Sequence, residues 1–314
     1  MSRFLLRRLG MTLIALLGVS TIVFALAKMI PGDPVRLALG TRFTEESYNA
    51  KRAALGLDQP LIQQYFSWLG NAVRGDLGVS FRNSEPVTSE VLARLPATLT
   101  LAAAALFIAL LIAIPVGIIS AVKSGSKLDY AATAASQVGV SVPDFWAGIM
   151  YILLFSLTWG LLPPSGYVPI GESFTGWLEH LILPALTVGL ISGSIITRFV
   201  RSAVIEALNQ DYVRTARARG LTERAIVFKH VLPNAAIPIV TVIGLQLGFL
   251  LGGVVVVEVI FAWPGIGRLA LDAVESRDYT VLQGAVLYLA AVFLLVNLIV
   301  DVLYVVLDPR AEIS

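Results

Sequence analysis

Uncharged apolar stretches are the dominant pattern along this chain of 314 residues. The longest lies between Arg94 and Lys123 and has 28 residues without an Asp, Glu, Lys or Arg. A helix needs about 20 apolar residues to cross the hydrocarbon core of a bilayer, which is about 30 Å thick. The stretches therefore predict six membrane-spanning helices, at residues 9–29, 97–122, 131–159, 180–201, 235–260 and 279–305.

The composition agrees with this interpretation. Hydrophobic residues make up 57% of the chain and charged residues 14%, and the mean hydropathy is +0.81. The first apolar run, residues 10–27, is longer than the roughly 7–15 residues of a typical signal-peptide core, so we expect it to be retained as a span. The predicted fold class is an all-α polytopic membrane protein.

The distribution of Lys and Arg predicts the orientation, because short cytoplasmic loops are enriched in these residues. Basic residues occur in the N-terminal segment, in the loop 123–129 and, seven of them, between Arg198 and Lys229. The loop 161–178 has none. Six spans with both termini in the cytoplasm satisfy this distribution.

Residues 31–95 would then form a small helical segment outside the cytoplasm. Their seven basic and seven acidic residues are balanced. Turn and cap residues predict three short helices, running from Asp33-Pro34 to Gly40, from Thr44 to Gly56 and from Asp58 to Gly70. This segment is compatible with a cap on the helix bundle and with a docking surface for an external partner.

The basic segment between the fourth and fifth spans has the pattern of two short helices. We expect Asp211 to cap the first, Gly220 to follow it in the left-handed conformation, and Thr222 to cap a second helix that ends before Pro233. A DNA-binding helix-turn-helix has a similar pattern, but the flanking spans would keep it from a major groove, so no nucleic acid is expected. An ordinary positive-inside loop would explain the cations but not the caps.

The same segment carries a resemblance to a known family. Gly220, nine further residues and then His230-Val231-Leu232-Pro233 resemble the Glu-Ala-Ala loop of ABC importer permeases. Arg214-Thr215-Ala216 takes the place of the family's Glu-Ala-Ala, and His230 replaces an Ile. Further segments, in order, resemble the dipeptide, oligopeptide, nickel and glutathione permease subfamily: FLLRRLG…PGDP, LGLDQPL, GDLGVSF, LPATL, SVPDFW, DYVRTARARGL, FAWPGIGRL, RDYTVLQG and NLIVDVLYVVLDPR.

The resemblance implies the permease subunit of a peptide importer in a bacterial inner membrane. Such an assembly contains a second homologous permease, two ATPase subunits that bind ATP and Mg, and an external substrate-binding protein. The resemblance also implies three parts of the chain: an N-terminal span (1–30), the external segment (31–95) and a permease core (96–310). The coupling loop, about 204–234, would contact the ATPase through Arg214, Thr215, Ala216, Arg217, Gly220, His230, Leu232 and Pro233.

Four polar or helix-breaking residues are candidates for the translocation path. Pro143 and Asp144 interrupt the third span, and a charge within a span is a functional hypothesis, although Asp144 could equally cap a restarted helix. Gln246 could line the path or bond a neighbouring helix. Glu258 could line the outer gate, although a surface pair with Arg268 is favoured. Pro115 and Gly117 are interpreted as marks of a kink and of close packing.

Other classes of function are less well supported by the sequence. An ion-coupled carrier often shows internal repeats and embedded charge pairs, and neither is evident. The chain has no cysteine and two histidines, so we expect no metal site, and no catalytic cluster suggests an enzyme. It lacks the G-x-x-x-x-G-K-[ST] phosphate-binding loop, so ATP hydrolysis is assigned to other subunits. Glutathione and nickel remain alternative cargoes.

Overall fold

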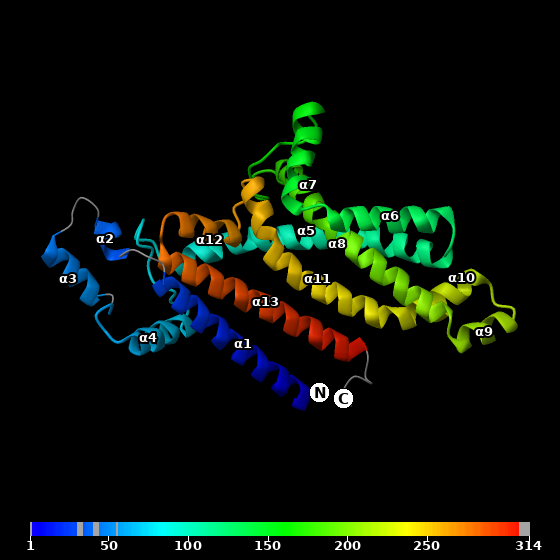
Figure 1. The fold of residues 1–314 in the computed structure, drawn as a ribbon, viewed down its shortest axis with the longest axis horizontal. Coiled ribbons are helices and arrows are strands. Elements are labelled where there is room, and N and C mark those ends of the chain that lie inside the picture. Colours follow the sequence, from blue (N-terminus) through cyan, green and yellow to red (C-terminus); the bar gives the residue numbers. More distant parts are fainter. Residues whose placement is uncertain (1, 30–33, 40–43, 55, 308–314) are drawn as a thin grey trace. The chain divides into compact units, whose positions relative to one another are not determined.

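The computed structural model describes residues 2–29, 34–39, 44–54 and 56–307 (Figure 1). These residues are helical apart from turns, loops and one isolated β-bridge between Val79 and Pro86, which confirms the all-α fold. The predicted helix start at Asp33, the helix end at Gly40 and the end of the core at 310 lie outside the described residues.

The chain forms two compact units. Unit 1 extends from Leu99 to Trp263 and includes both terminal segments, whereas unit 2 contains Leu6–Thr98 and Pro264–Leu295. The α-helices are α1 (Ser2–Met29), α2 (Pro34–Leu39), α3 (Glu45–Ala54), α4 (Leu61–Val73), α5 (Val87–Val122), α6 (Lys127–Ser141), α7 (Asp144–Tyr151), α8 (Phe174–Leu208), α9 (Asp211–Ala218), α10 (Glu223–Ile226), α11 (Leu232–Ile260), α12 (Ile266–Glu275) and α13 (Tyr279–Leu307); two π-helical segments are η2 (Ile152–Thr158) and η3 (Val227–Val231).

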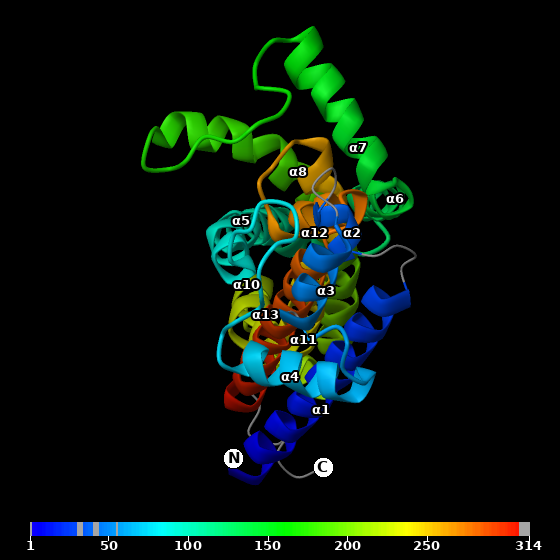
Figure 2. The same ribbon diagram turned by 90° about the vertical axis from the view of Figure 1, so that its left-hand side faces the viewer.

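Five of the six predicted spans are continuous helices, and the third is broken. Within the described residues, α1, α5, α8, α11 and α13 lie in helices long and apolar enough to cross a membrane. The expected span 131–159 is instead two helical segments that meet at an angle of 102° (Figures 1 and 2). Pro143 disfavours helical backbone at the residue before it, and Val142 is extended. Counting this bent pair as one span gives six.

Small residues allow close approach between α5 and α8 in unit 1. A Cβ added at Gly117 would lie 2.7 Å from Val200 Cβ and 2.9 Å from the Thr197 carbonyl oxygen. Ile196 and Val200 of α8 are fully buried in the same core. Small residues let membrane helices approach closely enough for such packing, and the expectation of close packing at Gly117 is confirmed.

Substitution of Gly117 with alanine is expected to destabilise unit 1. Overpacking typically costs about 1–3 kcal/mol, which exceeds the gain of about 1 kcal/mol that alanine brings to a helix interior. The control is Gly252→Ala on α11, where an added Cβ meets no atom within 4 Å. Thermal unfolding in detergent should give a lower midpoint for Gly117→Ala only, and equal shifts for both variants would contradict this account of the contact.

In unit 2, α12 is a helix that the sequence analysis treated as loop. Its buried residues Ile266, Leu269 and Ala273 pack in one core with Val87 of α5 and Val281 of α13. The spacing of the three residues is that of one helix face. The backbone N–H of Ile266 donates to Thr98 Oγ1 (2.9 Å), which satisfies one of the first unpaired donors of α12.

In the segment before α5, two predictions for α3 are confirmed and one helix boundary, the end of α4, is incorrect. Thr44 caps α3, since its Oγ1 accepts from the Ser47 N–H (3.1 Å), and Gly56 takes a positive φ of 62° after its end. The predicted end of α4 at Gly70 is wrong, because the helix continues to Val73. Gly70 therefore lies within the helix, and an added Cβ there would meet no atom within 4 Å.

Candidate functional site

The candidate site is the loop of unit 1 between α8 and α11, which the distribution of Lys and Arg predicts to be cytoplasmic. After α8 ends at Leu208, α9 begins with Gln210 as its N-cap residue. The expectation that Asp211 caps the helix is therefore wrong by one position. Asp211 lies in the first turn instead, where its charge favours the positive end of the helix dipole, and its carboxylate pairs weakly with Arg214 at 3.5 Å.

The turn between α9 and α10 has the predicted geometry. Gly220 has a φ of 76°, and Thr222 Oγ1 accepts a hydrogen bond from the Ala225 N–H (3.3 Å). Arg217 spans the turn with two contacts to Glu223, from Nε to Oε1 (2.7 Å) and from Nη2 to Oε2 (3.3 Å). Its hydrogen bond to Glu223 raises the pKa of Arg217. The two short helices are thus joined by a fixed turn.

Apolar side chains anchor this loop to the end of α8. Val213 and Ile226 are fully buried, and they share a core with Val204 and Ala207 of α8. Ala216 is also buried (6% exposed), so among the predicted contact residues it packs inward. Arg214, Thr215, Arg217 and Gly220 are exposed. These four residues therefore lie on the outer side of a loop whose base is apolar.

The second helix does not end before Pro233, as the sequence analysis expected. It continues through η3 into α11, and Pro233 lies in the first turn of α11. Because the helix is continuous from η3 into α11, the missing N–H of Pro233 removes one helical hydrogen bond at this junction. Asn234 Nδ2 donates to the His230 carbonyl (2.7 Å). His230 and Leu232 are half-buried and Pro233 is exposed, so only Pro233 of these three is open to a partner.

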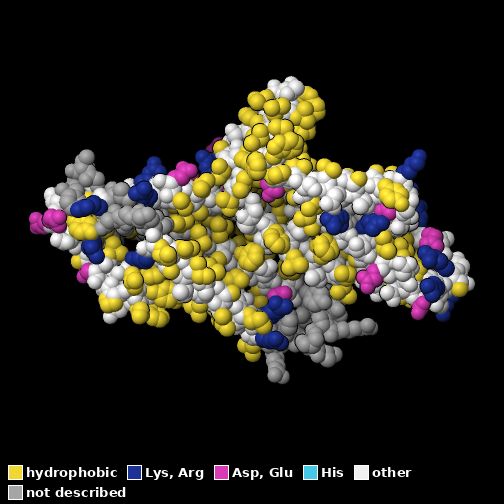
Figure 3. All heavy atoms as spheres, viewed as in Figure 1, with side chains coloured by type: hydrophobic (Ala, Val, Ile, Leu, Met, Phe, Trp, Pro, Cys, Tyr) yellow, Lys and Arg dark blue, Asp and Glu magenta, His cyan; other side chains and the backbone are white. Residues whose placement is uncertain are grey.

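Three exposed apolar side chains on the loop were not predicted as contact residues. Phe228 is 65% exposed, Leu221 42% and Tyr212 38%. Acidic and basic side chains gather over α9 and α10 (Figure 3). Exposed aromatic residues surrounded by charges are typical of binding surfaces. Tyr212, Leu221 and Phe228 could have been identified from the sequence, because they are apolar residues in a loop that is predicted to be cytoplasmic.

A buried ion pair fixes the neighbouring loop to α8. Arg201 donates to Asp129 through Nε (2.6 Å) and Nη2 (2.8 Å). Asp129 also accepts from Ser120 Oγ and from the Gly125 N–H (2.9 Å). The carboxylate is 3% exposed. This network joins α5, α6 and α8 about two turns before the loop begins, and nothing in the local sequence pattern indicated it.

The candidate path residues occupy different environments in unit 1. Pro143 is the N-cap residue of α7, and Asp144 is its first residue and half-buried. Gln246 is buried in α11. Glu258 is fully buried (0% exposed), so the predicted surface position is wrong, whereas its pairing with Arg268 stays a prediction.

Comparison with known proteins identifies the family. Residues 113–313 match the family described as binding-protein-dependent transport system inner membrane component, and residues 1–102 match the description of its N-terminal region. The chain is 43% identical to the dipeptide transport system permease protein DppB of Escherichia coli K12, over 99% of this chain and 98% of that protein. The chain belongs to this family.

Two further comparisons are with another peptide permease and with a solved ABC transporter structure. It is 39% identical to the oligopeptide transport system permease protein AppB of Bacillus subtilis, over 99% of this chain and all of that protein. Its fold resembles that of a chain in the inward-facing methionine ABC transporter MetNI, with a TM-score of 0.61 and 21% identity over 72% of this chain and 99% of that chain. The protein is a multi-pass inner-membrane permease of an ABC transporter.

The described part of the permease has no group of three or more His, Cys, Asp or Glu side chains that could hold a metal ion. Its two histidines lie on α8 and in η3.

Proposed function

We propose that this permease imports peptides, with di- and oligopeptides as the substrate class. The observation that carries the proposal is near full-length similarity, at 39–43% identity, to permeases named for dipeptide, di/tripeptide and oligopeptide transport. A binding protein outside the membrane would deliver the peptide, and a second homologous permease would complete the translocation path. Pro143, Asp144, Gln246 and Glu258 are the candidate path residues.

The loop 204–234 is proposed as the element that couples transport to ATP hydrolysis in two separate ATPase subunits, which bind ATP and Mg. Its apolar base packs on α8, so a force on α9 would be transmitted into the spans. Its outer face offers Arg214 and Phe228 to a partner. Cations of this kind pair with acidic side chains across an interface.

The other parts of the chain also have proposed roles in this peptide importer. Residues 1–30 form the N-terminal span, residues 96–310 form the permease core, and residues 31–95 face the external binding protein. The fixed turn at Gly220 supports transmission of movement, since a loop held by Arg217 and Glu223 changes shape less easily than an open one.

The proposal is tested by uptake into proteoliposomes that contain the permease with its second permease, ATPase subunits and binding protein. We expect uptake of a labelled dipeptide that requires both ATP and the binding protein, and competition by unlabelled peptides. Competition by glutathione or nickel in place of peptides would favour the alternative cargoes. Uptake that persists without ATP would contradict the importer and favour an ion-coupled carrier.

A further inference from the structure

The helix α4 of unit 2 exposes an apolar stripe. Ile62 is 72% exposed, Phe66 64% and Val73 82%. At about 100° of rotation per residue, these three positions lie within about 40° of one another around the helix. Figure 3 shows hydrophobic side chains gathered over α4, and the helix, LIQQYFSWLGNAV, contains no charged residue. An exposed apolar surface of this kind indicates a protein or membrane partner.

Two contacts with α1 determine which way the stripe faces. Near the end of α1, Lys28 Nζ donates to Gln64 Oε1 (2.5 Å). Eight residues earlier in α1, Ser20 Oγ and Thr21 Oγ1 lie 2.9 Å and 3.0 Å from the Tyr65 hydroxyl. The Gln64 side of α4 is therefore directed toward the end of α1, and the Tyr65 side is directed back along α1.

The stripe lies on the Tyr65 side of the helix. Its three positions are about 60–100° around the helix axis from Tyr65, but about 160–180° from Gln64. A third side of α4 packs against unit 2, because Trp68 and Ala72 contact its core. The stripe is thus directed along α1 toward the middle of the span, and not toward the end of α1 at Lys28.

The position of Ser20 within the span indicates the depth of α4. Arg8 and Lys28, the charges that flank the apolar run of α1, are 20 residues apart. This separation is about 30 Å of helix, which matches the hydrocarbon core of a bilayer. Ser20 lies about 12 Å below Lys28 along the helix axis. Because the Tyr65 hydroxyl reaches this level, α4 lies at the boundary between headgroups and acyl chains.

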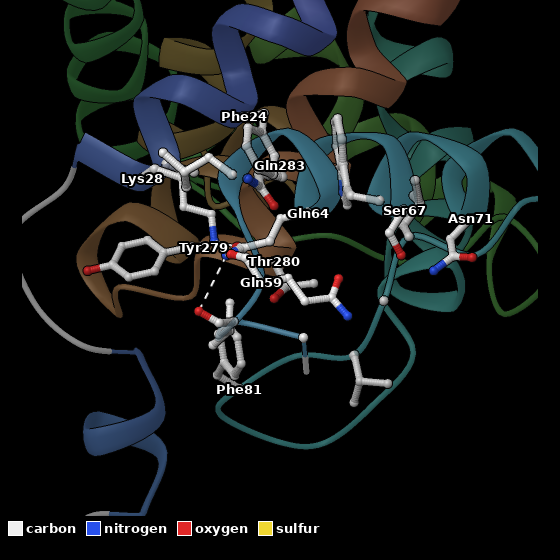
Figure 4. Close-up of a pocket in the computed structure, with 18 of the residues that line it drawn as sticks. Phe24, Lys28, Gln59, Gln64, Ser67, Asn71, Phe81, Tyr279, Thr280 and Gln283 are labelled. Carbon is white, nitrogen blue, oxygen red and sulfur yellow. Dashed lines mark hydrogen bonds between the residues drawn. The ribbon is translucent and has the colours of Figure 1, made fainter. Parts of the chain in front are cut away.

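The opposite face of α4 is polar and borders a cavity of about 710 Å³ within unit 2 (Figure 4). Gln64, Ser67 and Asn71 line this cavity, together with the cations Lys28 and Arg52. Burial of such groups in an apolar medium costs free energy unless they are hydrogen-bonded, so this face belongs on the aqueous side. The polar face and the apolar stripe thus have the arrangement that an interfacial helix requires.

We propose that α4 is an interfacial helix, with the side chains of Ile62, Phe66 and Val73 inserted between the headgroups and acyl chains of the outer leaflet. Two observations favour lipid over a protein partner. Contacts between membrane helices are enriched in small residues, whereas the stripe consists of large side chains. A water-soluble partner would have to reach below the headgroups. The inserted stripe fixes the external segment to the membrane surface beside α1.

The test uses spin labels at single cysteines, since the natural chain has none. Phe66→Cys places the label in the stripe, and Asn71→Cys is the matched control at an exposed position of the polar face. The permease, assembled with its second permease and ATPase subunits, is reconstituted in vesicles of phosphatidylethanolamine and phosphatidylglycerol. Electron paramagnetic resonance measures collisions with oxygen, which dissolves in the bilayer, and with a water-soluble nickel chelate.

The ratio of oxygen to nickel accessibility should be several-fold higher at Phe66→Cys than at Asn71→Cys. Ile62→Cys and Val73→Cys replace other exposed side chains of the stripe and should resemble Phe66→Cys, so the test does not depend on the folding of one variant. Equal ratios on the two faces would show that the stripe is in water and overturn the proposal. Labels in the stripe that neither reagent reaches would show that protein covers it, which also overturns the proposal.

Discussion

Replacement of Phe228 with aspartate should weaken binding of the ATPase subunits by about thirtyfold and reduce ATP-driven uptake. Phe228 is 65% exposed, yet its backbone is held between the buried Val227 and Val231. A rigid, exposed aromatic side chain suits insertion into a partner's cleft, and truncation of such a residue typically costs about 2 kcal/mol or more. The measurement is the dissociation constant between permease and ATPase in detergent, followed by uptake in proteoliposomes.

The control for this prediction keeps the apolar character of the site. Phe228→Leu should bind the ATPase within a few-fold of the wild type, whereas Phe228→Asp should not. Both variants should unfold at the wild-type temperature, because the side chain is mainly exposed and contributes little to the core. Normal ATPase binding by Phe228→Asp would show that this surface is not the docking site, even if uptake were lost.

The turn of the coupling loop could be predicted from sequence because its determinants are local. Gly220 is the residue that takes positive φ at low cost, and Thr222 accepts from a backbone N–H three residues later. The wider turn of η3 could not be predicted in this way. Its hydrogen-bond register depends on how Val227 and Val231 pack into the core of unit 1, which is a tertiary property.

The third span and α12 show two further limits of local patterns. Pro143 indicated a kink, but the angle of 102° depends on what the two segments pack against. The region of α12 lies between the predicted spans 235–260 and 279–305 and has only two basic residues, Arg268 and Arg277, so it was predicted to be an external loop. Its periodic residues Ile266 and Leu269 became informative only once a partner surface on α5 was known.

The ion pair between Asp129 and Arg201 was not predicted from the sequence. The two residues are 72 positions apart, and each has an ordinary local explanation. Asp129 is in the first turn of α6, where acids are favoured, and Arg201 agrees with the positive-inside rule. Only the packing of α6 on α8 shows that the two charges meet and that the Asp129 carboxylate is shielded from water.

Replacement of Asp129 with alanine should lower the free energy of unfolding by about 2–3 kcal/mol, because it leaves Arg201 without its bidentate partner and Ser120 without its acceptor. This is less than the roughly 3–5 kcal/mol for a fully buried pair, since the Arg201 side chain remains 29% exposed. Chemical denaturation of the permease in detergent measures the change. ATP-driven uptake should fall as well, because Arg201 lies about two turns before the end of α8, on which α9 and α10 pack.

The exposed pair of Asp211 and Arg214 on the coupling loop serves as a control, because it carries the same charges as Asp129 and Arg201 without the burial of Asp129. Asp211 and Arg214 are 3.5 Å apart, but their side chains are 96% and 77% exposed. Asp211→Ala should therefore change stability by less than about 0.5 kcal/mol, as removal of exposed pairs commonly does. The exchange Asp129→Arg/Arg201→Asp should restore only part of the loss, because the Ser120 hydroxyl and the Gly125 N–H are arranged for a carboxylate at position 129. Equal stability of Asp129→Ala and Asp211→Ala would show that the buried network does not hold α6 and α8 together.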